Sequence, residues 1–168
     1  MRGGSRGVRQ WGRPKRSRLD GTDHAAALAR VPVFEGCTKR ELARIDALTF
    51  EVALPKGYVL ARQDAPVLEV YFVVSGAAIV TRDGAMVGAL EPGACVGAAE
   101  MFANRPYAVS VTATTPLLVR VASPREMRSL VDGIPRLAHL RLRHVLPPAE
   151  AGAVEEPRPA EAANSPHL

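Results

Sequence analysis

The histidine and serine side chains of this chain could bind a metal or act in catalysis if their spacing brought them together. The four histidines lack the clustered spacing of a metal site; they are His24, His139, His144 and His167. Three serines have no histidine and carboxylate arranged to activate a hydroxyl; they are Ser110, Ser123 and Ser129. Strand and helix-cap roles explain the first two serines better. We therefore predict no metal site, no catalytic residues and no enzymatic activity.

Cys37 and Cys95 are the only cysteines, and they do not form a C-x-x-C pair. The N-terminus does not have the pattern of a secretory signal, and no apolar run approaches the ~20 residues that span a bilayer. The sequence therefore predicts reduced thiols in a cytoplasmic protein without a membrane segment. For Cys95, a buried inert thiol is the commoner alternative to a redox-active one.

The net charge of +5 is concentrated at the N-terminus. Residues 1–18 hold seven basic residues and no acidic one; they are Arg2, Arg6, Arg9, Arg13, Lys15, Arg16 and Arg18. The rest of the chain carries 15 basic and 17 acidic residues, a net charge of −2. Such an arm, with Trp11 for stacking, could bind nucleic acid without sequence preference. An upstream start codon is another explanation of the arm.

Composition divides the chain into a folded part and two ends. Residues 1–21, rich in Gly, Arg, Ser and Pro, are predicted to be a disordered basic arm. Residues 147–168, rich in Pro, Ala and Glu, are predicted to be a disordered tail. The domain between them covers 22–146. With 168 residues, the chain has room for one domain of this size.

Helices are predicted at both ends of that domain. The first pair covers 22–30 and 38–48, and Thr38 with Glu41 fits a capping box at the start of the second helix. Near the C-terminus, Ser123 and the residues after it predict a capped helix that Gly133 closes in the left-handed conformation. A last helix is predicted from 135 to about 146, with a basic face that we interpret as solvated.

Short strands are predicted between the helices, from 50 to 121. Runs rich in Val, Tyr, Phe and Thr alternate there with turn residues. The continuous apolar run 70–74 predicts a strand buried on both faces, and Asp83-Gly84 predicts a tight hairpin. The fold class is therefore mainly β, a double-stranded β-helix (jelly roll) with an N-terminal helical pair and C-terminal helices.

The stretch from Gly93 to Ala113 resembles the phosphate-binding cassette of the cyclic-nucleotide-binding domain, the sensor of catabolite-activator-type regulators. That cassette reads G-x-x-F-G-E-x-(A)-L, a short loop, and then P-R-x-A-(T/S)-V-x-A. The resemblance extends over 31–146. It is carried further by Phe34-Glu35-Gly36, Gly57 with Leu60, and the run from Tyr71 to Gly76. Asp64 departs from it, because the family prefers glycine there, and this substitution could distort one turn.

The resemblance implies a nucleotide pocket whose charged contacts are missing. Its positions here are Gly97, Ala98, Ala99, Tyr107 and Ala108. Ala98 replaces the glutamate that accepts the ribose hydroxyl, and Tyr107 replaces the arginine that pairs with the phosphate. Two charged neighbours could compensate if they shared a strand face with the lost groups, or they are ordinary solvated charges; they are Glu100 and Arg105.

The resemblance implies a stand-alone regulatory sensor module that acts through protein contacts, with weakened or lost binding of cAMP and cGMP. No other cofactor is expected. The alternative is a nucleic-acid-associated protein that binds through Arg2, Arg6, Arg9, Arg13, Arg16 and Arg18. The protein partner is not identified, and homodimerisation stays open. No helix-turn-helix is predicted after the domain, because the remaining segment is short and polar.

Overall fold

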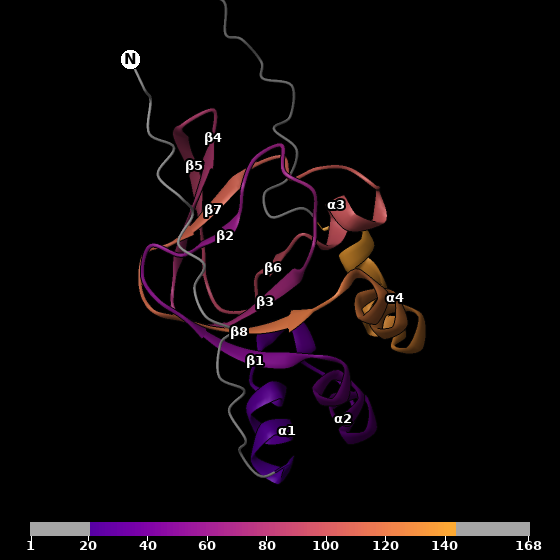
Figure 1. The fold of residues 1–168 in the computed structure, drawn as a ribbon. Coiled ribbons are helices and arrows are strands. Elements are labelled where there is room, and N and C mark those ends of the chain that lie inside the picture. The colour runs from indigo at the N-terminus through magenta and orange to yellow at the C-terminus, as the bar shows by residue number, and fades with distance from the viewer. Residues whose placement is uncertain (1–20, 144–168) are drawn as a thin grey trace, which may run out of the picture.

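The computed structural model describes residues 21–143, and these form a β-roll flanked by helices (Figure 1). The helical elements at the two ends are α1 (Gly21–Ala29), the 3₁₀ helix η1 (Pro32–Phe34), α2 (Lys39–Leu48), α4 (Pro124–Gly133) and the 3₁₀ helix η2 (Pro135–Arg141). The eight strands are β1 (Phe50–Leu54), β2 (Val59–Ala61), β3 (Val70–Ser75), β4 (Ala78–Arg82), β5 (Ala85–Leu90), β6 (Cys95–Val96), β7 (Ser110–Ala113) and β8 (Leu117–Ala122). The short helix α3 (Ala98–Phe102) interrupts them. The predicted fold class is confirmed.

The strands form two four-stranded antiparallel sheets, in the orders β1-β8-β3-β6 and β2-β7-β4-β5. Phe50 is opposite Val121 in the first sheet, and Ala78 is opposite Ala113 in the second. The inner faces of both sheets supply one core, and its most buried members are valines with no exposed surface; they are Val73, Val80, Val96, Val111 and Val119. Branched aliphatic side chains pack well on pleated surfaces, so a core poor in aromatic residues still fills the roll.

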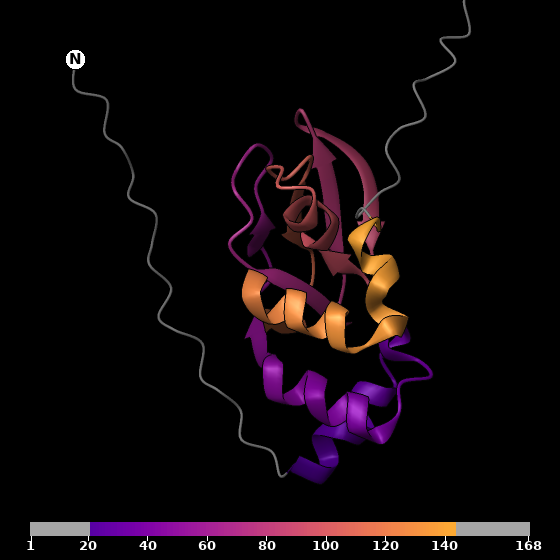
Figure 2. The ribbon, with the colours of Figure 1, turned by 90° about the vertical axis from the view of Figure 1, so that its right-hand side faces the viewer.

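Strand β3 faces two cores at once. Tyr71 and Val73 point into the roll, whereas Val70 and Phe72 belong to a second core beneath the helices. There the Phe72 ring lies 5.1 Å from the Phe34 ring, centroid to centroid. The first four residues of β3 are buried, which confirms the prediction of a strand covered on both faces. Figure 2 shows α2 and α4 side by side over this second core.

The predicted turns and helix starts are present. Asp83 and Gly84 both have positive φ, 51° and 82°, as the tight turn between β4 and β5 requires. At α2, the Glu41 amide donates to the Thr38 hydroxyl at 3.2 Å and the Thr38 amide donates to the Glu41 carboxylate at 2.6 Å. Ser123 caps α4 in the same way.

One prediction about the C-terminal helices was wrong, and a second holds for the start of the helix but not for its length. Gly133 is not left-handed; it ends α4 as a helical residue, and the extended residue Ile134 caps the helix. A Cβ on Gly133 would lie 2.7 Å from the Arg44 guanidinium carbon, so the glycine makes room for a side chain from α2. The last helix is a 3₁₀ helix, because Ile134, Leu137 and Leu140 repeat every three residues and are all fully buried.

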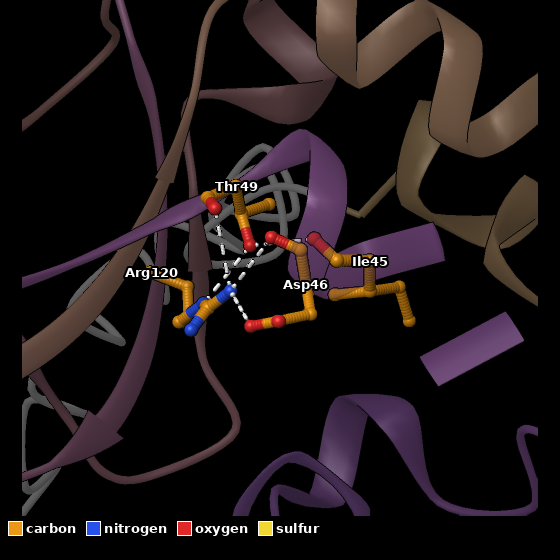
Figure 3. Close-up of polar contacts among 4 residues, drawn as sticks. All are labelled: Ile45, Asp46, Thr49 and Arg120. Carbon is orange, nitrogen blue, oxygen red and sulfur yellow. Dashed lines mark hydrogen bonds and ion pairs between the residues drawn. The ribbon is translucent and has the colours of Figure 1, made fainter. Parts of the chain in front are cut away.

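A buried arginine joins the helices to the roll (Figure 3). Arg120, on β8, is 2% exposed, and its Nε donates to the Thr49 hydroxyl at 2.9 Å. Its terminal nitrogen forms an ion pair with Asp46 at 2.6 Å and also donates to the Asp46 and Thr49 carbonyls. The Thr49 hydroxyl in turn donates to the Ile45 carbonyl at 2.7 Å. The last turn of α2 is thereby fixed to the middle of a sheet.

Candidate functional site

The candidate site lies where β6 runs into α3, at Gly97. This glycine is left-handed, with φ of 93°, and it is the N-cap of α3. A Cβ there would lie 3.1 Å from Cε1 of Tyr107 and 3.2 Å from the Glu69 carbonyl oxygen. Both the backbone conformation and the close neighbours therefore require glycine at this position. The chain thus turns at Gly97 into α3, and the Tyr107 side chain lies against this turn.

Tyr107 is that side chain, and hydrogen bonds fix it in place. It is 5% exposed, and its hydroxyl donates to the Glu69 carbonyl oxygen at 2.9 Å. Its amide donates to the Ala65 carbonyl at 3.0 Å, and its own carbonyl accepts from the Asp64 amide at 2.8 Å. Three bonds thus join Tyr107 to the loop between β2 and β3. Asp64 takes the left-handed conformation itself, with φ of 65°, so the turn forms without the glycine that the family prefers.

The surroundings of Tyr107 are acidic. Burial raises the pKa of the Tyr107 phenol, and the carboxylates of Glu100 and Glu69 raise it further. Glu100 is itself only 4% exposed, so the interpretation of this residue as a solvated rim charge was wrong. A neutral phenol near two carboxylates cannot supply the positive charge that a phosphate needs. The phenol of Tyr107 thus stands, uncharged, where the family has an arginine.

The other predicted positions offer few polar groups. Ala98 and Ala99 are buried in the first turn of α3, at 0% and 1% exposure, and Ala108 is exposed on the loop after Tyr107. A methyl group at position 98 cannot accept a hydrogen bond from a ribose hydroxyl. At these positions the chain therefore keeps the backbone amides at the start of α3 but lacks the polar side chain of the family.

Arg105 lies in a different cleft from Tyr107. It is exposed and lines a cleft of about 350 Å³ with Asp64 and Arg128, whereas Tyr107 lines a cavity of about 490 Å³ with Glu69. The expectation that these residues share a strand face was wrong. Residues 105–107 form a loop, and Glu100 lies in a helix, where a separation of two residues turns side chains to different sides.

Sequence reasoning missed Glu69, which organises the cavity. Its carbonyl accepts from Tyr107, and its carboxylate accepts from the Tyr71 hydroxyl at 2.8 Å. Burial raises the pKa of Tyr71, and this bond to Glu69 raises it further. A contact to a backbone carbonyl has no residue signature, so no sequence signal points to it. The sequence marks the Glu69 carboxylate only weakly, through its position directly before an apolar strand.

The remaining candidates for chemistry are separate from one another. Cys37 and Cys95 are free thiols, and burial raises the pKa of Cys95 to about 12. Among residues 21–143, no group of three or more His, Cys, Asp and Glu side chains could hold a metal ion. In the same part of the chain, no helix has the length and apolar character needed to cross a bilayer. The arginine-rich arm, His144 and the C-terminal tail lie outside the described residues.

Known proteins share this fold and its sequence pattern. The family model of the cyclic nucleotide-binding domain matches residues 51–133. cAMP-bound PfPKA-R is 14% identical over 73% of this chain and 48% of its own, with a TM-score of 0.62. A cAMP-binding acyltransferase from Mycobacterium smegmatis is 25% identical over 71% of this chain and 38% of its own, with a TM-score of 0.59. The catabolite activator protein of Thermus thermophilus is 20% identical over 65% of this chain and 54% of its own, with a TM-score of 0.57.

The match covers only part of each of these solved structures. The chain spans about half or less of the length of these solved structures, so it corresponds to one part of each. No curated protein matches the sequence. The matched segment contains Gly97 and nearly all of the two antiparallel sheets, so the sequence match and the fold identify the same part of the chain. Through residues 51–133, the chain belongs to the cyclic nucleotide-binding domain family.

Proposed function

We propose that this chain is a cyclic-nucleotide-binding-like regulatory module that has weak or no affinity for cAMP and cGMP and acts through protein contacts. The single observation that carries the proposal is the place of Tyr107. Its ring lies against Gly97, and its hydroxyl is bonded to the Glu69 carbonyl, so a neutral side chain occupies the space beside the cassette turn.

The energetic cost of these replacements supports a large loss of affinity. Removing one partner of a buried charge pair costs about 2–5 kcal/mol, and each 1.4 kcal/mol is tenfold in affinity. A micromolar pocket that loses its arginine binds about 30-fold to 4,000-fold more weakly, and loss of the ribose hydrogen bond brings the expected Kd to roughly 0.1 mM or weaker. Tyr107 offers no positive charge in its place, because burial and the nearby carboxylates raise the pKa of its phenol. The methyl group of Ala98 removes the ribose contact as well.

Action through protein contacts is supported by two observations. The cAMP-binding acyltransferase and the catabolite activator protein each extend well beyond the part that matches, so in those proteins the domain is joined to other parts. In this chain, the edge strand β5 has no charged side chain, and it exposes Met86 at 64% and Val87 at 42%. Uncharged edge strands are suited to pairing with another chain, although a bulge near Val87 interrupts the regular register.

Isothermal titration calorimetry with cAMP and cGMP tests the proposal. We expect no saturating heat below roughly 0.1 mM of either nucleotide. Urea unfolding of the same sample establishes that the protein is folded, because a folded domain gives a cooperative transition. Micromolar binding of either nucleotide would overturn the proposal and would mean that backbone donors or Arg105 compensate for the missing groups.

A further inference from the structure

The cavity beside Tyr107 has the dimensions of a small-molecule site. Its volume is about 490 Å³, and it lies between β2, the loop before β3, and the two tyrosines Tyr71 and Tyr107. Its other apolar lining comes from Val59, Leu60, Ala65, Pro66 and Leu68. Leu68 is 73% exposed and Val59 is 36% exposed at the rim. Cavities of roughly 300–1,000 Å³ with apolar walls and few polar groups are typical of ligand sites.

Two charged residues line this cavity, and they differ in their exposure to solvent. Glu69 is half-buried, and its carboxylate is held by the Tyr71 hydroxyl. Arg62 is exposed, so water and salt screen its charge more than they screen that of Glu69. Burial is the main cause of the raised pKa values of Tyr71 and Tyr107, and the Glu69 carboxylate raises both further.

The donors of the cassette turn are cut off from the cavity. Gly97, Ala98 and Ala99 are not among its lining residues, whereas Tyr107 is. The Tyr107 ring therefore separates the cavity from the amides at the start of α3. A ligand in this cavity meets tyrosine and aliphatic side chains, the Glu69 carboxylate and, at an exposed position, Arg62, and it does not meet the backbone amides at the start of α3.

We propose that this cavity binds a small organic cation, a protonated amine on an aromatic body, which is opposite in charge to a cyclic nucleotide. The apolar walls cover the body and the Glu69 carboxylate attracts the ammonium group, while Tyr71 and Tyr107, 7% and 5% exposed, form part of the wall. This inference rests on the proposed function, since it requires Tyr107 to remain against Gly97.

A charge series on one ring system tests the inference. Tryptamine is a cation, 3-methylindole is neutral and indole-3-acetate is an anion, and all three carry the same indole. Each is titrated into the ¹⁵N-labelled full chain while amide chemical shifts are recorded. We expect tryptamine to bind about fivefold more tightly than 3-methylindole, the ratio that one solvent-accessible charge pair supports. Indole-3-acetate is expected to bind most weakly, and the shifts should centre on Leu60, Leu68 and Tyr71.

The variant Glu69→Gln shows whether the carboxylate causes the preference. A glutamine still accepts from Tyr71, so the cavity is kept while the charge is lost, and we expect tryptamine and 3-methylindole to bind equally. Glu91→Gln is the matched control, because Glu91 is an exposed carboxylate in another cleft. It removes one negative charge from the protein, and the preference for tryptamine should stay.

Four results would overturn the inference: no saturable shift with any probe, shifts away from this cavity, equal or tighter binding of the anion, or an unchanged preference in Glu69→Gln. A cooperative unfolding transition of each variant excludes misfolding as the cause. A separate titration with cAMP keeps the two proposals apart. Micromolar cAMP binding contradicts the proposed function, whereas weak binding of both cAMP and tryptamine contradicts only the inference about the cation.

Discussion

Two sites in this domain place a polar side chain in a buried position, and they solve the problem in opposite ways. Beneath the sheet, Arg120 is 2% exposed and meets a carboxylate, a hydroxyl and two carbonyl groups. Beside the cassette turn, Tyr107 is 5% exposed and remains neutral near Glu100 and Glu69. At the first site, the positive charge of Arg120 is balanced by the Asp46 carboxylate. At the second site, the neutral Tyr107 stands where the family has an arginine.

This comparison shows how an arginine with a structural role differs from one that binds a ligand. Arg120 has its partners inside the protein, so its charge is balanced whether or not a ligand is present. A phosphate-binding arginine has its partner in the ligand and is costly to bury when the ligand is absent. Replacing it with tyrosine removes that cost and adds a hydrogen bond to Glu69. The fold of the domain therefore does not need a nucleotide to balance a buried charge at this position.

Restoring the two family residues should have the largest effect on nucleotide binding and would sharpen the comparison. We expect Ala98→Glu combined with Tyr107→Arg to tighten cAMP binding by about a hundredfold or more, because a buried charge pair is worth about 2–5 kcal/mol. Calorimetry measures the gain. The control Ala98→Glu with Tyr107→Gln lacks the cation and should show little gain. If the arginine variant binds no better than the original chain, the shape of the pocket limits affinity rather than its charge.

Removing the other buried side chain should destabilise the domain strongly. Arg120→Ala removes the buried guanidinium that donates to the Asp46 carboxylate, the Thr49 hydroxyl and two carbonyls, so we expect the free energy of unfolding to fall by about 3–5 kcal/mol. Urea titration at neutral pH measures it. Arg105→Ala, at an exposed position, should change stability by less than about 0.5 kcal/mol. A small loss in Arg120→Ala would mean that water replaces the arginine and that the charge is less enclosed than its burial indicates.

The pH dependence of stability should follow from the groups whose pKa is raised. Burial raises the pKa of Cys95 from 9.0 to about 12, and the pKa values of Tyr107 and Tyr71 are also raised. Between these folded and unfolded values the unfolded chain loses protons first, so stability falls as pH rises above about 9. The loss is about 1.4 kcal/mol per pH unit for each such group.

Cys95→Ala isolates the contribution of the thiol to this pH profile. It should flatten the decline of stability between about pH 9 and pH 10, where the unfolded thiol ionises before the unfolded tyrosines. Urea unfolding at several pH values measures both profiles. An identical slope in the variant would show that Cys95 ionises in the folded state as easily as in the unfolded chain.

The smallest effect is expected from Tyr107→Phe. This change removes the hydroxyl that donates to the Glu69 carbonyl but keeps the ring against Gly97. One hydrogen bond of this kind contributes about 1 kcal/mol, so stability should fall by that amount and cAMP affinity should not rise. Thermal unfolding and calorimetry on one sample check both. Tighter cAMP binding in the phenylalanine variant would indicate that the hydroxyl bond, rather than the ring, blocks the turn.

Most of the fold was predictable because its signals are local. The Asp83-Gly84 turn and the Thr38 and Ser123 caps depend on residues a few positions apart, and the structure has all of them. Gly133 was misassigned because its role depends on Arg44, far away in the sequence. The 3₁₀ geometry of η2 was readable in the three-residue apolar repeat, but the segment was assigned to a longer helix.

The site was less predictable than the fold. The resemblance locates Gly97 and Tyr107, but it does not tell where the tyrosine hydroxyl is bonded, because its partner is a backbone carbonyl. The burial of Glu100 and the separation of Arg105 depend on α3 and the loop that follows it. Arg120 could have been singled out from the sequence, because it is a lone charge within the apolar run 117–122.

The most direct measurement of the central claim is the response of the Gly97, Ala98 and Ala99 amide signals to cAMP. These backbone groups would face a phosphate if Tyr107 left its position. In the ¹⁵N-labelled chain we expect them to stay near their free positions at roughly 10 μM nucleotide, about tenfold below the limit set above, and to shift and saturate in the Ala98→Glu, Tyr107→Arg variant. Saturating shifts of the same three amides at micromolar cAMP in the unmodified chain would contradict the account.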